Sequence, residues 1–356
     1  MMKRVKVVRI IIYTLLSLIT LAILGGGYLW YSMRQTMDAI YEPLPSTKWE
    51  EPVFEAEPTQ QVGNADRIVA QAAPYKNMLS SAVSTLGQTA ASEEMDVLDA
   101  GEADRIRHPD LQREDPFSLL LLGVDERVGD RGRSDTMILL TIQPKSESAV
   151  AISIPRDTRV LIPHMDKYDK INHAYAFGGT SLSVQAVEQL FGVPISYYMK
   201  TNMEGFVKIV DTLGGVDVVN KREFTSNYHF PEGSQHLDGD HALSYIRMRK
   251  EDPQGDFGRT QRQRDVLGNA VERVTNVSSI LKLPKLLSHL SNNVKTNLSS
   301  QDMLALAKTY RPAIHKVDTL ILNGTGERID GIYYYTVKPE DRQNVRQRLL
   351  EHLRDS

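Results

Sequence analysis

The chain of 356 residues exceeds the size of one typical domain and can bury a large hydrophobic core. Its 42 Lys and Arg residues against 45 Asp and Glu residues give a net charge of −3, which argues against general nucleic-acid binding through overall charge. Because it contains no cysteine, the chain has no disulfides, no thiolate metal ligands and no thiol nucleophile.

A membrane anchor is predicted near the N-terminus. Four basic residues lie among the first nine positions, and no charged residue occurs from Ile10 to Met33. About 20 apolar residues suffice for a helix to cross a hydrocarbon core of about 30 Å, so the stretch 10–33 is long enough. The basic residues place 1–9 in the cytoplasm and the rest of the chain outside the membrane. A cleaved signal peptide is the alternative, but the apolar stretch is longer than usual for one and no A-x-A triplet follows it.

The next stretch, 34–115, is predicted to be an extracytoplasmic stalk or linker. Four prolines occur among acidic residues between Glu42 and Pro58, a composition that is typical of a spacer. The Ala-, Ser- and Gln-rich stretch 65–98 is compatible with a helix. The remaining residues, 116–356, are predicted to form the main folded domain.

The first strand of this domain is predicted at 117–122, where the apolar run is typical of a strand buried on both faces. A charged loop follows, and a second apolar strand is predicted at 136–142. The loop contains Asp125, Arg127, Arg131, Arg133 and Asp135. Since ligands of open α/β sheets bind beyond the carboxyl ends of strands, these acids and guanidiniums predict a site for a metal and a polyanion. For this stretch alone, a surface loop with mutually neutralising charges is the alternative.

Strands and helices alternate further along the chain. A third predicted strand, 149–155, ends at a second charged pair, Arg156 and Asp157. The elements predicted next are an extended segment at 158–163, a turn-rich loop at 166–179, a helix at 181–190, a strand at 195–200, a helix at 203–213 and a strand at 216–219. This order predicts an α/β fold whose sheet is at least partly covered by helices on both faces.

A second charged stretch lies between 238 and 264. Asp238 is predicted to cap a short helix, and Arg247 and Arg249 follow that helix two residues apart. Arg259 and Gln263 open the next helical run at a spacing that places them on one helix face. Forked guanidiniums and helix N-termini both suit phosphate oxygens. A solvated, salt-bridged start of a helix is the alternative.

The C-terminal part completes the domain. Residues 266–310 are predicted to be helical and rich in apolar side chains, which either line a slot for a lipid tail or form ordinary core. Two strands at 318–324 and 331–337 are predicted to pair with each other. An amphipathic helix is predicted at 339–353.

Seven motifs, in this order along the chain, resemble those of the LytR-CpsA-Psr family. They are LLLGVDER (120–127), GRSDTM (132–137), SIPRDTRVLIP (153–163), KINHAY (170–175), LGGVDV (213–218), DGDHALSYIRMRK (238–250) and GDFGRTQRQR (255–264). The resemblance covers the domain at 116–356, and the N-terminal anchor also fits it. It implies a catalytic domain with a central mixed sheet flanked by helices.

Members of that family are known as extracytoplasmic phosphotransferases of mostly Gram-positive envelopes. The resemblance implies that the protein moves an anionic glycopolymer, teichoic acid-like or capsular, from a polyprenyl pyrophosphate carrier to peptidoglycan. It also implies that Asp125 and Asp135 hold Mg²⁺. The residues implied in binding the pyrophosphate are Arg133, Arg156, Arg247, Arg249, Arg259 and Gln263. The expected location is the cell membrane, with a single span and the catalytic domain outside.

The chemistry of the residues agrees with this expectation independently. Mg²⁺ prefers one or two carboxylates together with phosphate oxygens and water. Phosphoryl transfer depends on positioning and charge neutralisation, so arginines and a metal suffice without a nucleophilic side chain. Asp157 is either a proton acceptor or a partner that holds the neighbouring arginine. Arg127, Arg159 and Arg262 are expected to be weaker phosphate contacts, and His173 lacks metal-ligand spacing.

A function of a different class stays open at this point. A membrane-anchored regulator could bind the pyrophosphate lipid without making bonds, and hydrolysis of that lipid is a close variant of the transfer. A binder of pyrophosphate needs arginines but not two metal-ligating acids. The pair of Asp125 and Asp135 therefore favours the transferase.

Overall fold

The computed structural model describes residues 31, 34–45, 52, 98–127, 129–249, 252, 256–275, 293–310, 312–313 and 317–354. The predicted anchor at 10–33 lies outside these residues except for Tyr31, and so does the stretch 46–97 except for Pro52. Within the described ranges, no helix combines the length and the apolar composition that crossing a membrane requires.

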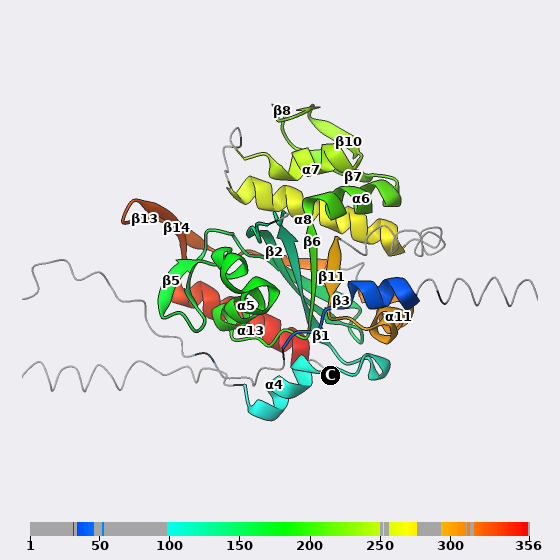
Figure 1. Ribbon diagram of the computed structural model, residues 1–356, viewed down its shortest axis with the longest axis vertical. Coiled ribbons are helices and arrows are strands. Elements are labelled where there is room, and N and C mark those ends of the chain that lie inside the picture. Colours follow the sequence, from blue (N-terminus) through cyan, green and yellow to red (C-terminus); the bar gives the residue numbers. More distant parts are fainter. Residues whose placement is uncertain are drawn as a thin grey trace, which may run out of the picture.

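A six-stranded mixed sheet forms the centre of the fold, with the strand order β11-β6-β1-β2-β3-β12 (Figure 1). Its strands are β1 (Phe117–Val124), β2 (Ser134–Gln143), β3 (Ser148–Ser153), β6 (Tyr197–Asn202), β11 (Val294–Thr296) and β12 (Val317–Leu320). β1 is parallel to β6 and antiparallel to β2, which is itself antiparallel to β3. The carboxyl ends of β1, β3 and β6 therefore meet at one edge of the sheet. The prediction of an α/β fold around a mixed sheet is confirmed.

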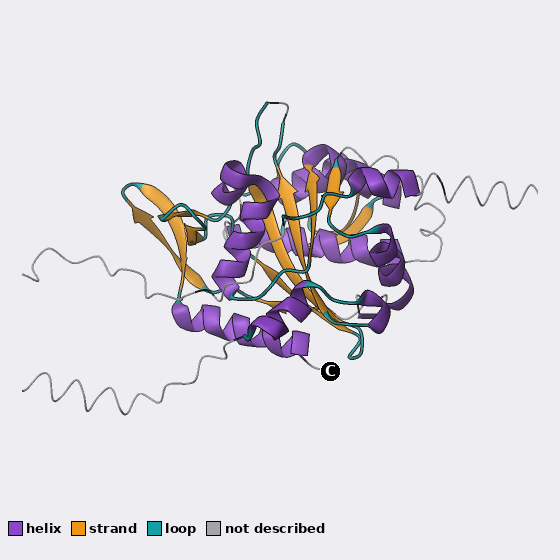
Figure 2. Ribbon diagram, turned by 60° about the horizontal axis from the view of Figure 1, so that its bottom comes forward, coloured by secondary structure: helices purple, strands orange, loops and turns teal. Residues whose placement is uncertain are grey.

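Helices cover both faces of this sheet (Figure 2). On the first face lie α4 (Ala100–Arg107), α5 (His173–Phe191) and α13 (Pro339–Arg354). Their apolar side chains form one core with alternate residues of β1, including Leu120 and Leu122. α13 contributes through the spacing that one helix face requires, because Val345, Leu349 and Leu353 are all buried.

The opposite face carries a separate layer, which Figure 1 shows above the sheet. The layer consists of α6 (Met203–Leu213), α7 (Gly239–Arg247), α8 (Asp256–Thr275) and a ribbon of β7 (Val216–Asn220) and β10 (Gly233–Leu237). It has its own hydrophobic core. At the far end of the same face, α11 (Ser300–Thr309) belongs to another core with Phe117 and Ile142. Because these two cores are separate, neither closes the middle of this sheet face.

The remaining elements are short. They are η2 (Leu111–Arg113), β4 (Arg159–Ile162), β5 (Lys167–Lys170), β8 (Phe224–Thr225), β9 (His229–Phe230), β13 (Gly324–Ile329) and β14 (Ile332–Val337). β4 pairs with β5, β8 with β9, and β13 with β14.

Three predicted elements differ from the structure. The loop predicted at 166–179 contains β5 and the start of α5, which continues through a kink at Gly179. The helical prediction for 266–310 holds in α8 and α11 and fails at β11, while 276–292 lies outside the described residues. The strand at 331–337 pairs with 324–329 and not with 318–324, because the Asp330-Gly331 pair makes a two-residue hairpin turn. β12 is thereby left to join the central sheet beside β3.

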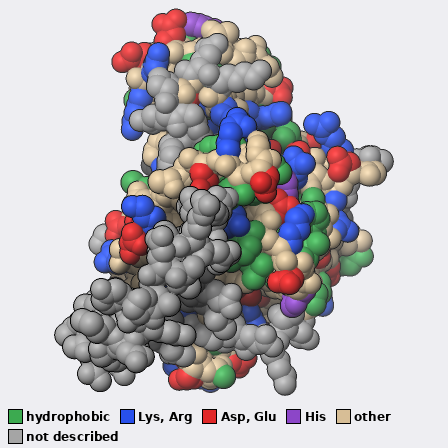
Figure 3. Space-filling view, turned by 90° about the vertical axis from the view of Figure 1, so that its left-hand side faces the viewer, with side chains coloured by type: hydrophobic (Ala, Val, Ile, Leu, Met, Phe, Trp, Pro, Cys, Tyr) green, Lys and Arg blue, Asp and Glu red, His purple; other side chains and the backbone are tan. Residues whose placement is uncertain are grey.

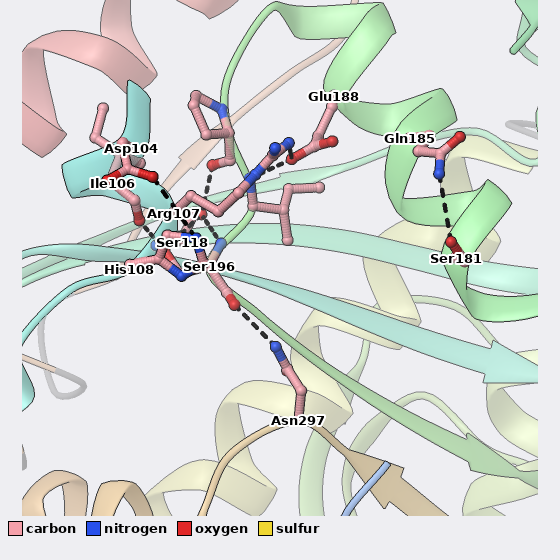
Figure 4. A network of polar contacts seen from close by, with 12 residues as sticks. Asp104, Ile106, Arg107, His108, Ser118, Ser181, Gln185, Glu188, Ser196 and Asn297 are labelled. Carbon is pink, nitrogen blue, oxygen red and sulfur yellow. Dashed lines mark hydrogen bonds and ion pairs between the residues drawn. The ribbon is translucent and has the colours of Figure 1, made fainter. Parts of the chain in front are cut away.

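Part of the predicted linker belongs to the folded unit. Ala103 and Ile106 of α4 are buried in the core of the first sheet face. Arg107 pairs with Glu188 of α5 at 2.5 Å, and the hydroxyl of Ser196 donates to the backbone oxygen of Ile106 (Figure 4). The linker prediction therefore does not hold for 98–115, where apolar residues are too few and too widely spaced to form a recognisable pattern.

Arg262 fastens α8 to the C-terminal end of α7. Its guanidinium donates to the backbone oxygens of Tyr245 at 3.1 Å and Met248 at 2.5 Å, and it pairs with Asp252 at 2.6 Å. The last carbonyl groups of a helix have no partner within the helix, and a buried guanidinium supplies one here. Only 10% of the Arg262 side chain and 9% of the Asp252 side chain are exposed.

Replacing Arg262 with Met is expected to lower the free energy of unfolding by about 3–5 kcal/mol, because the buried Asp252 carboxylate would lose the charge of the Arg262 guanidinium. Denaturant unfolding of the purified protein measures this change. Arg348→Met, at an exposed position of α13, is the matched control and should change stability by no more than about 0.5 kcal/mol. Equal losses in the two variants would contradict the assigned role of Arg262.

Candidate functional site

The loop after β1 holds the first candidate carboxylate between its two arms. The backbone N–H of Asp125 donates to the backbone oxygen of Arg133 at 3.1 Å, and Oδ1 of Asp125 accepts the backbone N–H of Arg133. Gly132 has a φ of 67°, and a Cβ at this position would lie 2.4 Å from that carboxylate oxygen. Glycine is therefore required for the close approach of the two arms.

A β-bulge brings the second candidate carboxylate to the same edge of the sheet. The register between β1 and β2 shifts between Gly123 and Val124, so that Asp135 has no opposite residue in β1. Such a bulge can redirect a side chain next to a functional site. Oδ1 of Asp135 accepts a hydrogen bond from Nη1 of Arg156 at 2.9 Å. Arg156, which follows β3, and Asp135, near the start of β2, thus form an ion pair.

Asp157 lies between two cations. Its Oδ1 is 2.7 Å from Nζ of Lys170, and its Oδ2 is 3.8 Å from Nε of Arg156. Asp157 does not line the large cavity described below. This geometry favours the interpretation that Asp157 holds Arg156 in place over the interpretation that it accepts a proton.

The second charged stretch is organised by the ends of α7 and α8. Asp238 caps α7 by accepting the backbone N–H of His241 at 2.9 Å, as the sequence predicts. Arg247 is the last residue of α7, and Arg249 lies two residues further along the chain. Both side chains are exposed. Arg259 of α8 is only 6% exposed.

A cavity of 1830 Å³ brings the two charged stretches together on the sheet face that carries α6, α7 and α8. The candidate residues that line it are Asp135, Arg156, Arg247, Arg249, Arg259 and Gln263. Figure 3 shows Lys and Arg side chains gathered where the layer of α6, α7 and α8 meets the part of the molecule that contains the central sheet. Arg264 also lines the cavity, and burial lowers the pKa of its guanidinium, with the charge of Asp265 opposing the shift.

Most of the other residues that line the cavity are apolar. The sheet contributes Leu119, Leu121, Ile138, Leu140 and Met199, and the helices contribute Phe206, Ile209, Leu243, Leu267 and Met303. The sequence predicts a lipid slot only for 266–310, so the contribution of the sheet is not predicted. The available signal was the unbroken apolar character of the first two strands, which presents apolar side chains to both faces of the sheet.

Other candidates, Asp125 among them, do not line this cavity. The side chain of Arg133 is exposed, and Arg127 is exposed and makes backbone hydrogen bonds with Asp130. Arg159 lies over the ring of Tyr168, with 4.2 Å between its Cζ and the ring centroid. Arg262 binds the backbone oxygens at the end of α7, as described above, and we call this contact the Arg262 clamp. The structure therefore gives no support to phosphate contacts by Arg133, Arg127, Arg159 or Arg262.

The two candidate carboxylates suit Mg²⁺ when oxygens of a ligand and of water complete its coordination. Among the described residues, no group of three or more His, Asp or Glu side chains is placed to hold a metal. Asp125 and Asp135 offer two carboxylates at one edge of the sheet. Mg²⁺ keeps several waters and is commonly held by one or two carboxylates plus phosphate oxygens. The pair therefore fits a metal that binds together with a phosphorylated ligand.

Comparisons with known proteins identify relatives of this chain. The LytR_cpsA_psr family matches residues 77–351. The polyisoprenyl-teichoic acid–peptidoglycan teichoic acid transferase TagU of Bacillus mycoides (strain KBAB4) is 46% identical over 245 residues, which cover 68% of this chain and 81% of that protein. The crystal structure of B. subtilis TagU is 42% identical with a TM-score of 0.56, covering 68% of this chain and 98% of that one. The structure of TagT bound to LIIa-WTA is 32% identical with a TM-score of 0.60, covering 74% and 98%.

The family match contains both charged stretches and all six strands of the central sheet. The family expected from the seven motifs is confirmed, and the chain belongs to the LytR-CpsA-Psr family.

Proposed function

We propose that the protein is an extracytoplasmic phosphotransferase that moves an anionic glycopolymer, teichoic acid-like or capsular, from a polyprenyl pyrophosphate carrier to peptidoglycan. The observation that supports this proposal most strongly is one cavity that combines an arginine-rich part with an apolar interior. A lipid diphosphate has the same two parts, an anionic head and an apolar tail. The name of the TagU relatives, which describes such a transfer, also supports it.

The apolar interior is the proposed site of the polyprenyl tail. The cavity volume of 1830 Å³ exceeds the range of about 300–1,000 Å³ that is usual for small-molecule sites. A long hydrocarbon chain would use this space, and each buried methylene group contributes about 0.8 kcal/mol. Leu121 and Ile138 of the sheet would contact the tail from one side, and Phe206 of α6 from the other.

The diphosphate is proposed to lie among the arginines at the polar part of the same cavity. Arg156 comes from the exit of β3, Arg247 and Arg249 from the end of α7, and Arg259 with Gln263 from α8. Guanidiniums bind phosphate oxygens through paired, charge-assisted hydrogen bonds. Four guanidiniums from three elements would surround a head group that carries several negative charges.

Asp125 and Asp135 are the proposed ligands of Mg²⁺. When bound, the ion would neutralise negative charge on the diphosphate. Asp135 would then have two roles, because its Oδ1 also accepts from Arg156. A carboxylate can accept several such contacts at once through its two oxygens.

The proposed transfer needs no nucleophilic side chain. A hydroxyl of the acceptor attacks the phosphorus next to the glycopolymer, its proton passes to water or to the leaving phosphate, and the bond to the lipid phosphate breaks. The leaving lipid phosphate takes the negative charge, which Arg247 and Arg249 would stabilise. Asp157 is assigned a positioning role, because its carboxylate lies between Lys170 and Arg156.

The proposed location is the cell membrane of a Gram-positive type envelope. A single span at 10–33 would leave the N-terminus in the cytoplasm and the catalytic domain at 116–356 outside. The charge pattern around the apolar stretch supports this orientation.

Reconstitution tests the proposal. Purified protein mixed with Mg²⁺, a labelled lipid-linked glycopolymer and peptidoglycan fragments is expected to yield labelled peptidoglycan. The product should disappear when a chelator removes the metal. Binding of the lipid without any product, at saturating acceptor, would favour the regulator instead.

In the same assay, Asp135→Asn is expected to lower the transfer rate at least about 100-fold, because one metal-ligating charge is lost while the shape of the side chain is kept. Lipid binding should persist in this variant, since the apolar cavity is intact. Asp166→Asn, at an exposed turn between β4 and β5, is the matched control. Full Mg²⁺-dependent activity of Asp135→Asn would remove this residue from the metal site.

Arg249→Ala is expected to weaken binding of polyprenyl diphosphate about tenfold or more, because a charge-assisted contact to the phosphates is lost. Binding of the corresponding alcohol, which has no phosphate, should change little. Titration of both lipids into the purified protein measures the difference, with Arg348→Ala as the control. An unchanged affinity for the diphosphate would place the head group elsewhere.

A further inference from the structure

A second, smaller pocket of 350 Å³ lies on the other side of the same loop. Strand β6 shows how the two spaces are separated, because successive side chains of a strand point to opposite faces of its sheet. Met199 and Thr201 line the large cavity, whereas Lys200 between them lines the small pocket. The small pocket therefore belongs to the sheet face that carries α5.

The loop between β1 and β2 contributes to the small pocket, and the strand ends that it joins, at Val124 and Asp135, line the large cavity. Asp125, the proposed metal ligand, is followed directly by Glu126, which lines the small pocket. Arg131, near the other end of this loop, also lines the pocket. Its Nη1 donates to the backbone oxygens of Ala176 and Phe177 of α5, at 3.3 and 3.1 Å. One short loop thus connects the proposed reaction centre to a pocket for which the proposed mechanism has no use.

The charges of the two spaces differ. Arginines outnumber acids in the polar part of the large cavity, which suits a diphosphate. In the small pocket two acids, Glu42 and Glu126, balance two bases, Arg131 and Lys200. A polyanion gains nothing from such a balanced lining. The pocket suits a neutral ligand that offers both hydrogen-bond donors and acceptors.

The lining also presents polar groups of both kinds. The hydroxyl of Tyr175 donates to Oε2 of Glu126 at 3.1 Å and accepts from Nζ of Lys200 at 3.4 Å. Burial, together with the charge of Glu126, raises the pKa of Tyr175, so the phenol stays neutral and keeps its proton. Lys200 in turn lies 3.5 Å from Oε1 of Glu42. These contacts hold two carboxylates and one ammonium group at fixed positions around the pocket.

Thr180 adds a polar group that the protein leaves unused. It lines the pocket and is 6% exposed, and its hydroxyl has no hydrogen-bond partner among the described residues. Buried polar groups are almost always hydrogen-bonded, so an exception is a sign of a missing ligand or water. The kink of α5 at Gly179 makes the space beside it, because φ and ψ of 65° and −148° suit glycine alone and interrupt the helix.

We propose that this pocket binds a neutral, amide-bearing sugar of the acceptor glycan and so places the acceptor one loop away from the diphosphate. The inference rests on the proposed function, because it assigns the acceptor side of that transfer. Carboxylates, an ammonium group and hydroxyls are suitable partners for sugar hydroxyls and an acetamido group. The volume of the pocket lies at the lower end of the range for small-ligand sites, which suits one or two sugar rings.

Direct binding tests this inference without any catalysis. The neutral tetramer of N-acetylglucosamine is passed over the immobilised full chain, and surface plasmon resonance measures its affinity. Saturable binding is expected, and Glu126→Gln should weaken it about tenfold, because contacts to a charged oxygen are the stronger ones. Glu204→Gln, at an exposed position of α6, is the matched control and should bind like the unchanged protein.

Thr180→Val is the second variant. It replaces an unpartnered hydroxyl with a methyl group of the same shape, so the unfolding midpoint is not expected to fall while the affinity for the tetramer does. No binding of the tetramer, or equal binding by Glu126→Gln and Glu204→Gln, overturns the assignment. Glu126-dependent binding of a peptidoglycan stem peptide, with none of the tetramer, overturns the choice of a sugar.

The transfer assay separates this inference from the proposed function. The transferase proposal holds if product forms. The pocket assignment also holds if Glu126→Gln raises the KM for the peptidoglycan fragment about tenfold with little change in affinity for the lipid diphosphate. If product forms and that KM is unchanged, the pocket assignment fails and the transferase stands. If no product forms but the tetramer binds in a Glu126-dependent way, the transferase fails and the glycan pocket stands.

Discussion

The antiparallel pairing of β1 with β2 is the constraint on which the site depends. The ladder runs without interruption from Phe117 to Gly123 and then shifts by one residue, which sends Asp135 out of the ladder. Both strands are buried by apolar side chains, and a slip of one residue would exchange their faces, so the packing determines the register. Asp125 and Asp135 are consequently placed by the hydrophobic core, and Arg156 is placed by Asp135.

The cavity results from the way the second layer is built. α6, α7 and α8 pack around a core of their own, and α11 covers only one end of the sheet. The sheet face between them lines the cavity with apolar side chains, and the arginines lie beside the cavity at the ends of α7 and α8. The Arg262 clamp stabilises those ends through the carbonyl groups of α7. The packing of the helices, the cavity and the position of its arginines thus all follow from the two-layer arrangement on this sheet face.

Local patterns predicted much of this protein, and contacts between distant segments decided the rest. Apolar runs located the first three strands, and Asp238 marked the start of α7. The Asp330-Gly331 pair is a local hairpin signal, and it favours the β13–β14 pairing over the predicted pairing of 318–324 with 331–337. No local pattern distinguishes Arg262, which binds backbone carbonyls, from the neighbouring residues that line the cavity. The bulge at Asp135 and the second pocket likewise depend on which segments meet in space.

A crystal structure of the protein with a polyprenyl diphosphate and Mn²⁺ in place of Mg²⁺ tests the central claim most directly, because anomalous scattering locates the metal. The account predicts a metal peak at the carboxylates of Asp125 and Asp135, phosphate oxygens on Arg156, Arg247 and Arg249, and the lipid tail inside the large cavity. A diphosphate bound away from these arginines, or a tail lying outside the cavity, would contradict it.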